Sequence, residues 1–290
     1  MTIDNKVSIL ENCSPGLMGS TLGFTCYSVE VLNNMKNLWN IKHSDDKIET
    51  SEPFKIWDSL RKKFSQVCHT EQCWIRQTFL KGNIHGDIMK YTFAPTSPKD
   101  WSDNPFMWLS SIDITSVMSH FEKYFPQFIF IGPTPIDFDK IQLDGKCVWT
   151  ELCDFNLANL LSKRKKKIGI IFNTDTHNKD GEHWISMFID MAASPNPYIF
   201  YFDSTGYRMP KEIKKLSTRI IKQANELGID MVLHENKKTH QKGTTECGMY
   251  SLYMIIELLT MKKTYEYFMN NRVDDDSMKD LRNRYFNKPV

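Results

Sequence analysis

The sequence has no apolar run long enough to cross a membrane and no excess of charge of either sign. A membrane-spanning helix needs about 18 or more consecutive apolar residues, whereas stretches such as residues 128–131 have only the length of a strand. The 37 Lys and Arg residues nearly balance the 35 Asp and Glu residues, which neither requires nor excludes a nucleic-acid partner. We therefore expect no membrane association, and contact with DNA stays open.

The sequence also lacks a signal peptide, a myristoylation glycine and the cysteine spacing of a disulfide framework. The first residues, Met1 to Asn5, fit neither kind of targeting signal. The seven cysteines are odd in number and scattered through 290 residues, which is typical of reduced thiols in a cytosolic compartment. We accordingly expect Cys147 and Cys153 to be thiols of the hydrophobic core.

The cysteines and histidines show no common metal-binding spacing. Cys68, His69 and Cys73 are close in sequence, with His85 farther on, but they match no common zinc-finger pattern. Apolar neighbours such as Phe64 favour helical packing there instead. We therefore expect neither a metal site nor a cofactor.

Apolar periodicity divides the chain into two parts. Residues 29–39 and 53–67 have the spacing of amphipathic helices, and a stretch rich in Pro, Ser, Asp and Lys follows at residues 91–105. The sequence thus predicts a mostly helical N-terminal region over residues 1–95 and a second domain over residues 96–290.

The second part mixes short apolar runs with helical patterns, as in an α+β fold. The elements expected there are a helix capped by Asp113 and ending before Pro126, strands at 167–173, 183–191 and 198–203, a helix at 210–227, a strand at 229–234, a helix at 247–259 and a last helix from Asp276 through Tyr285. Residues 247–259 are apolar on nearly every side, which is typical of a helix buried inside a domain. We predict a small mixed sheet packed against this central helix.

A basic run, Lys163 to Lys167, follows the apolar residues Leu157, Leu160 and Leu161. Cations are favoured at the C-terminal end of a helix, so this run indicates a helix end with a solvated face. A nuclear-localisation or DNA-binding role is the less favoured alternative.

Cys247 begins the buried helix directly after a polar, Gly-containing loop. Unpaired N–H groups and the positive end of the helix dipole favour a thiolate at such a position. The same N–H groups can donate to an oxyanion that forms beside the sulfur, and Gly248 would let a substrate backbone approach closely. A buried, inert thiol is the alternative when Cys247 is considered alone.

A nucleophilic thiol needs a base, and the base needs an acceptor that orients it. His183 opens one predicted strand and Asp203 closes the next. Strands joined by the loop at 193–197 would be antiparallel neighbours, so the start of the first lies beside the end of the second. The pattern therefore predicts that His183 and Asp203 meet. His177 lies in a polar loop and His240 has no strand-end carboxylate placed for it, so both are weaker candidates.

The order of these motifs resembles that of the ubiquitin-like-protein protease family, which includes SUMO proteases and the adenovirus protease. The matching motifs are His183-Trp184, then Phe202-Asp203-Ser204, then Gln241 six residues before Cys247-Gly248. Papain-type enzymes place their cysteine before their histidine and do not fit. Residues 172–190 and 245–252 are most similar to the branch that processes core proteins of large DNA viruses, such as African swine fever virus and poxviruses. The resemblance covers residues 105–275.

The resemblance implies a role for each matching residue. The implied catalytic residues are Cys247 as nucleophile, His183 as base, Asp203 as the acid that orients the base, and Gln241 as an oxyanion donor. Trp184 would flank a narrow channel for a Gly-Gly sequence, and Trp108 would cover the other side. SUMO proteases have Asn-Asp where this chain has Ser110-Ser111, which weakens the case for a folded ubiquitin-like partner.

The function that the resemblance implies is that of a cysteine endopeptidase with a papain-related α+β fold. It would process viral structural polyproteins after Gly-Gly sequences, in the host cytoplasm at the site of assembly or in the virion. A deubiquitinase or deSUMOylase is the first alternative. An acetyltransferase with the same order of catalytic residues and an inactive binding module are the other two.

Overall fold

The computed structural model describes residues 12–77 and 86–289. Contacts separate the chain into two compact units: unit 1 comprises Met1–Ser97 and Arg284–Val290, and unit 2 comprises Pro98–Asn283. Every residue predicted above to act in catalysis or substrate binding belongs to unit 2. That each unit folds on its own, as a division into domains after residue 95 requires, stays a prediction.

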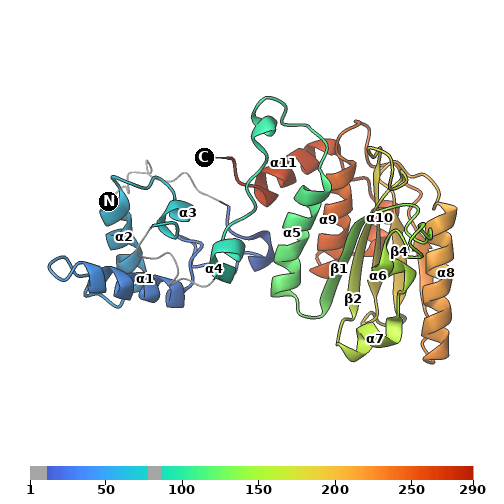
Figure 1. Ribbon diagram of the computed structural model, residues 1–290, viewed down its shortest axis with the longest axis horizontal. Helices are drawn as coiled ribbons and strands as arrows, with labels where there is room; N and C mark the ends of the chain where they lie inside the picture. The colour runs from blue at the N-terminus through green and yellow to red at the C-terminus, as the bar shows by residue number, and fades with distance from the viewer. Residues whose placement is uncertain (1–11, 78–85, 290) are drawn as a thin grey trace. The chain divides into compact units, whose positions relative to one another are not determined.

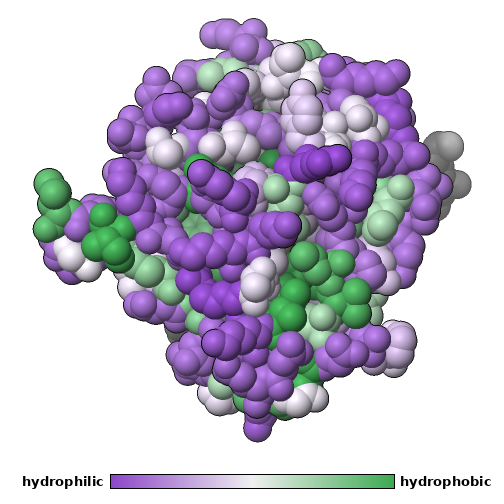
Figure 2. All heavy atoms as spheres, turned by 90° about the vertical axis from the view of Figure 1, so that its right-hand side faces the viewer, coloured by the Kyte–Doolittle hydropathy of each residue, from purple (hydrophilic) through white to green (hydrophobic). Residues whose placement is uncertain are grey.

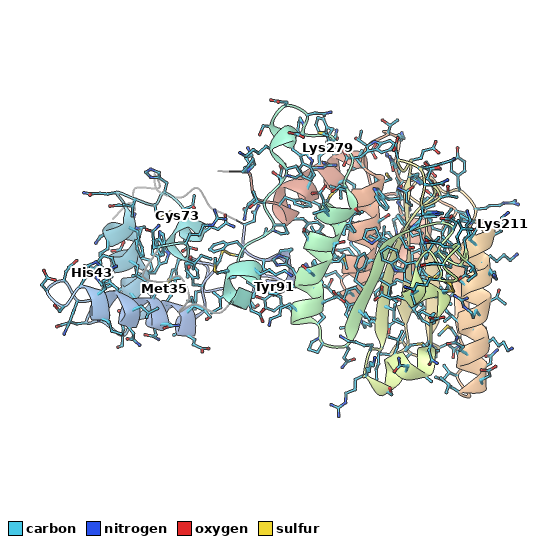
Figure 3. All side chains as sticks on the ribbon, viewed as in Figure 1. Met35, His43, Cys73, Tyr91, Lys211 and Lys279 are labelled. Atoms are coloured by element: carbon cyan, nitrogen blue, oxygen red, sulfur yellow. A yellow bond between two sulfur atoms is a disulfide. The ribbon has the colours of Figure 1, made fainter. Side chains whose placement is uncertain are left out.

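Unit 1 is built from short helices, as the periodicity predicts. Its elements are η1 (Pro15–Leu17), α1 (Val29–Lys42), α2 (Pro53–Phe64), α3 (Glu71–Trp74) and α4 (Gly86–Tyr91). The Ser28 hydroxyl caps α1 by accepting the N–H of Val31, and Pro53 starts α2 at a position where no N–H is needed. The apolar faces of α1 and α2 meet in a core that includes Leu60 and Met35, which Figure 3 labels.

Residues near the C-terminus complete unit 1. The N–H of Asn287 donates to the carbonyl of Pro95, and the N–H of Ser97 donates to the carbonyl of Asn287. The side chain of Asn287 accepts the N–H of Asn12 and donates to the carbonyls of Asn12 and Ala94. Because Asn287 is buried, these bonds join three segments that are far apart in the sequence.

Three disulfides contradict the expectation of reduced thiols. They join Cys13 to Cys26, Cys68 to Cys73 and Cys147 to Cys153. Cys147 and Cys153 are therefore not free thiols of the core. The spacing of cysteines does not reveal such pairs, because backbone turns bring each pair of Cα atoms to within 6.2 Å or less. Cys68 is bonded through its sulfur to Cys73, which Figure 3 labels, and His85 lies outside the described residues.

A five-stranded mixed sheet forms the centre of unit 2. Its strands, in spatial as well as chain order, are β1 (Phe128–Pro135), β2 (Lys167–Asn173), β3 (Trp184–Asp190), β4 (Tyr198–Phe202) and β5 (Val232–Glu235). β3 runs antiparallel to β2 and β4, whereas β1 is parallel to β2 and β5 to β4. The predicted antiparallel pairing of β3 and β4 is confirmed. β1 was not predicted as a strand because Pro133 and Pro135 interrupt its pattern.

Helices cover both faces of this sheet (Figure 1). They are α5 (Ser111–Tyr124), α6 (Thr150–Cys153), α7 (Leu157–Ser162), α8 (Lys211–Glu226), α9 (Cys247–Leu259), α10 (Tyr265–Asn270) and α11 (Asp275–Tyr285), and η2 (Lys99–Ser102) precedes them. α9 packs on β2 and β3 and α5 packs on β1, while α8 lies against the opposite face (Figure 1). Nearly every residue of α9 is buried. The predicted α+β fold, with a mixed sheet and a central buried helix, is confirmed.

The start of α5 differs from the prediction. Ser110, not Asp113, is the N-cap: its hydroxyl accepts the N–H of Asp113, while the carboxylate of Asp113 accepts the N–H of Ser110. This reciprocal capping box places Asp113 in the first turn. Ser and Asp both favour helix starts, so the sequence pattern located the helix but not its cap.

Hydrophilic residues cover most of the side of unit 2 on which α8 lies (Figure 2). Within the described ranges, no helix is both long enough and apolar enough to cross a membrane. The basic run Lys163–Lys167 follows the end of α7, as its charge pattern predicts. Part of the run stabilises the fold, because Lys165 donates to two backbone carbonyls and Lys167 pairs with Asp190.

Candidate active site

Cys247 is the first residue of α9, and its side chain is almost fully buried. It is also the free cysteine of the described chain. The N–H groups of the first helical turn have no partners inside the helix, and with the helix dipole they favour a negative charge at this end. The carbonyl of Glu246 accepts the N–H of Tyr250 and so starts the helix. The sulfur therefore lies beside these N–H groups at the positive end of the helix dipole.

His183 and Asp203 meet where β3 begins and β4 ends, as predicted. β3 begins at Trp184, directly after His183, and β4 ends at Phe202, directly before Asp203. His183 Nε2 lies 2.9 Å from Asp203 Oδ1. Asp203 is buried, and the N–H and hydroxyl of Thr205 donate to the same oxygen at 2.8 and 2.7 Å. The carboxylate is thereby fixed in position for the imidazole.

The imidazole of His183 lies between an acid and a thiol. Burial acts to lower its pKa, but hydrogen bonds with the side chains of Asp203 and Cys247, together with their negative charges, raise the pKa of His183 to about 10. At neutral pH the imidazole therefore carries a proton. A protonated imidazole beside a thiolate is a pair that can attack a carbonyl carbon and then protonate the leaving group.

Gln241 lies on the loop before α9, with its side-chain amide held at both ends. Oε1 accepts the hydroxyl of Ser204 at 2.7 Å, and Nε2 donates to the carbonyl of Gly243 at 2.9 Å. The loop is tied to the turn after β4, because the N–H groups of His240 and Gln241 donate to the carbonyl of Ser204. Nε2 makes one hydrogen bond within the described residues, so its second N–H can donate to a ligand.

Trp184 and the segment Trp108-Leu109 meet beside the first turn of α9. Trp184 Nε1 donates to the carbonyl of Leu109 at 2.9 Å. A Cβ added to Gly248 would lie 3.0 Å from the Cβ of Leu109. The lack of a side chain at Gly248 thus makes room for Leu109. The sequence had suggested that it makes room for a substrate backbone. Trp108 is 44% exposed, so its ring is accessible from outside.

Sequence reasoning missed a buried ion pair next to Cys247. Arg282 of α11 lies 3.4 Å from Glu246 and donates to the carbonyl of Met107 at 2.7 Å. Arg282 and Glu246 are no more than 5% exposed. Arg282 therefore links the residue before Cys247 to the residue before Trp108. No local pattern signals this pair, because Arg and Glu on helices are ordinarily exposed.

α11 also holds the loop that carries Gln241. The carboxylate of Asp275 accepts the N–H groups of Lys242 and Gly243 at 3.1 and 3.0 Å and the hydroxyl of Tyr250 at 2.8 Å. Sequence analysis placed a helix start at the neighbouring aspartate but gave no sign of this contact with a loop some thirty residues earlier. The loop before Cys247 is thus fixed from both sides, by the turn after β4 and by α11.

The two histidines set aside in the sequence lie elsewhere. His177 Nδ1 is 2.7 Å from Asp137, a carboxylate from the turn after β1 that the sequence did not suggest as its partner. His240 is fully buried and its Nδ1 accepts the N–H of Val273; burial lowers the pKa of His240 to about 4, which keeps it neutral. In the part of the chain that the structure describes, no group of three or more His, Cys, Asp or Glu could hold a metal ion.

Residues 115–288 match the family model described as "Ulp1 protease family, C-terminal catalytic domain". The chain belongs to the Ulp1 protease family. It is therefore a thiol protease. The matched range contains His183, Asp203, Gln241 and Cys247, whereas Trp108 lies before it.

Two viral proteins are similar to this Ulp1-family chain over most of its length. R355 of Acanthamoeba polyphaga mimivirus, named as a thiol protease, is 28% identical over 286 residues, which cover 91% of this chain and 90% of R355. A cysteine protease of African swine fever virus is 24% identical over 266 residues, which cover 85% of this chain and 93% of the viral protein. In another isolate of that virus the same protein is named as a SUMO-1 cysteine protease.

The crystal structure of the African swine fever virus protease has the same fold. It matches 99% of this chain and 100% of its own with a TM-score of 0.68, at 19% sequence identity. The fold of this Ulp1-family chain, with its helical N-terminal region, is thus shared with a viral protease despite little sequence identity.

Proposed function

We propose that this chain is an endopeptidase that cleaves viral structural polyproteins after a Gly-Gly sequence. In this proposal Cys247 is the nucleophile, His183 is its base and Asp203 orients the base. The observation that carries the proposal is the place of His183, whose Nε2 lies 2.9 Å from the carboxylate of Asp203 and whose pKa is raised by that carboxylate and by the side chain of Cys247. A half-buried histidine placed between a thiol and an acid has the arrangement that nucleophilic catalysis requires.

The reaction follows from these positions. The sulfur of Cys247 attacks the carbonyl carbon of the scissile bond, a C–S bond forms, and the carbonyl electrons move onto oxygen. The N–H groups at the start of α9 and Nε2 of Gln241 donate to that oxyanion. His183 passes its proton to the leaving amine as the C–N bond breaks. A water molecule then gives its proton to His183 and hydrolyses the thioester, which returns the thiolate.

Specificity for glycine is proposed from the contact between Trp184 and the segment that carries Trp108. The carbonyl bonded by Trp184 belongs to Leu109, which packs against Gly248 one residue after the nucleophile. An extended chain passing between the two indoles would find room only for residues without a side chain. Glycine is therefore expected just before the cut and one residue earlier.

The substrate class and the place of action are proposed from the relatives. R355 of the mimivirus and the African swine fever virus protease are both viral proteins, and each matches this chain over at least 90% of its own length. A viral protease that cleaves structural proteins has its substrates where virions assemble. We therefore propose viral structural polyproteins as substrates, cleaved in the host cytoplasm at assembly sites or inside the virion.

Incubation of the purified protein with Gly-Gly-containing structural polyproteins, followed by sequencing of the new N-termini, tests the proposal. Cleavage after Gly-Gly is expected from the wild type and not from Cys247→Ala or His183→Ala. The double variant should be no worse than either single variant, because these residues act as a unit. His177→Ala is the matched control, since it breaks a His–Asp pair outside this site and should leave the rate unchanged.

Other outcomes would assign a different function or specificity. Cleavage of ubiquitin-like fusions but not of short Gly-Gly peptides would indicate a deubiquitinase or deSUMOylase, and consumption of acetyl-CoA would indicate a transferase. Replacing the glycine just before the cut by alanine should lower kcat/KM by about 100-fold or more, the cost of misplacing a carbonyl by about an ångström. A cleavage profile that accepts alanine or serine equally well would contradict the slot between Trp108 and Trp184.

A further inference from the structure

Ser204 directly follows Asp203, and its hydroxyl holds the amide of Gln241. We propose that Ser204 is a positioning residue, which orients and polarises Gln241 as the donor to the oxyanion. The inference rests on the proposed function, in which Gln241 makes that donation. The turn after β4 would then orient both the base and the oxyanion donor, because Asp203 binds His183 and Ser204 binds Gln241.

The chemistry of its two partners fixes which way the amide of Gln241 faces. The carbonyl of Gly243 can only accept a hydrogen bond, so the nitrogen of the amide must face it. The oxygen of the amide then faces Ser204, whose hydroxyl must donate. An amide turned the other way would place its oxygen against the Gly243 carbonyl. Gly243 is itself tied to α11, because its N–H donates to the carboxylate of Asp275.

Burial gives the hydroxyl of Ser204 its effect on Gln241. Ser204 is 1% exposed and Gln241 is 5% exposed, so bulk water cannot replace a lost donor. Without the hydroxyl, Oε1 of Gln241 would be a buried acceptor with no partner, which is costly. A donor at Oε1 also polarises the amide and strengthens donation from Nε2, because linked hydrogen bonds reinforce one another in a low dielectric.

The backbone of the loop does not depend on this hydroxyl. The N–H groups of His240 and Gln241 both donate to the main-chain carbonyl of Ser204, and that carbonyl is present in any variant at the position. Ser204→Ala therefore removes the hydroxyl that donates to the amide of Gln241. It leaves the backbone hydrogen bonds between turn and loop in place. The variant separates orientation of the amide from folding of the loop.

The test is a double-mutant cycle on cleavage of a Gly-Gly peptide by the full chain. Gln241→Ala should lower kcat by about 10²-fold to 10³-fold, the usual loss for one oxyanion donor. Ser204→Ala should lower kcat about tenfold, the effect of one hydrogen bond, and leave KM within about twofold. In the Gln241→Ala background, Ser204→Ala should have no further effect, since the group that it orients is gone.

Two further variants control for folding. Thr239, on the loop before α9, is exposed and its hydroxyl donates to the carbonyl of Thr205 in the turn, so Thr239→Val removes one hydrogen bond between loop and turn without touching Gln241 and should leave kcat unchanged. Ser204→Thr keeps the hydroxyl and should retain most of kcat. Thermal unfolding of each variant shows whether the chain is folded.

Each outcome separates the inference from the proposed function. A loss in Ser204→Ala that persists at the same size in the Gln241→Ala background would show a general structural role and overturn the inference alone. So would a folded Ser204→Thr that loses as much as Ser204→Ala. A Gln241→Ala variant with full activity would show that Gln241 does not donate to the oxyanion. Ser204 would then have no donor to position. A wild type that cleaves no Gly-Gly substrate would overturn the proposed function as well.

Discussion

The charge of His183 depends on a balance between burial and its two partners. Burial acts to lower the pKa, and the carboxylate of Asp203 with the side chain of Cys247 raises it to about 10. The pKa of a histidine in an unfolded chain is about 6.5. Because the folded state binds the proton more tightly, the contribution of this group to the free energy of unfolding is fully present below about pH 6.5. It is lost as the pH rises through about 10.

Asp203→Asn should shift that balance toward burial and lower the pKa of His183. We expect the alkaline limit of wild-type activity near pH 10, the pKa of His183, and the variant should move that limit to lower pH. The free energy of unfolding should also fall less between about pH 6.5 and pH 10 than in the wild type. An NMR titration of the His183 ring, with kcat/KM measured against pH, checks both effects. An unchanged alkaline limit would mean that Asp203 does not control the charge of His183.

The first turn of α9 and the segment before α5 form a close contact between two elements. Leu109 is buried, and its Cβ would lie only 3.0 Å from a Cβ at position 248. A main-chain-proximal atom such as Cβ cannot swing away, so either the helix or the segment must move. Leu109 follows Trp108, and its carbonyl accepts a hydrogen bond from Trp184. A shift of Leu109 would therefore displace both indole rings.

Gly248→Ala should therefore lower kcat/KM by about 100-fold, the cost of roughly an ångström of misplacement. The loss in free energy of unfolding should be about 1–3 kcal/mol, as for overpacking elsewhere. Adding Leu109→Ala, which removes the neighbouring Cγ and Cδ1, should restore part of the rate. Gly86→Ala is the control, because an added Cβ there meets nothing within 4 Å. Full activity in Gly248→Ala would show that the contact does not shape the site.

The elements that sequence patterns located are those with a strong local signal. α9 begins and ends where its apolar run predicts, and β2 has the predicted bounds. His183 and Asp203 were brought together by reasoning about one hairpin. The parts that sequence reasoning missed depend on distant partners or on exceptions to local rules: Arg282 meets Glu246 across 36 residues, and β1 contains prolines. Ser204 was noted only as part of a motif, since its hydrogen bond to Gln241 spans 37 residues.

Over the whole molecule, the two units divide the chain in a way that truncation can test. All residues proposed to act in catalysis lie within Pro98–Asn283, so a protein of residues 98–283 should fold and keep a Cys247 that reacts with a peptide vinyl sulfone. Activity on large substrates should fall, because unit 1 is missing. Loss of the folded state in this protein would show that the units depend on each other.

A longer truncation product, residues 98–290, provides the matched comparison. It keeps Phe286, which is 4% exposed in the full chain, and Asn287, whose partners Asn12 and Ala94 are gone. An apolar side chain and unpaired polar groups exposed together favour association. Light scattering should therefore show more aggregation for residues 98–290 than for residues 98–283. Equal behaviour of the two proteins would mean that the C-terminal segment is not held by unit 1.

The hydrogen bonds of Asn287 also set an order of events during synthesis. Residues 12–97 leave the ribosome first, yet the asparagine that joins Asn12 to Ala94 is made only after all of residues 98–283. Domains generally fold as units while the chain emerges. The sheet and α9 can therefore assemble before Asn287 is available to unit 1, so a nascent chain would bring Cys247, His183 and Asp203 together before its N-terminal helices are complete.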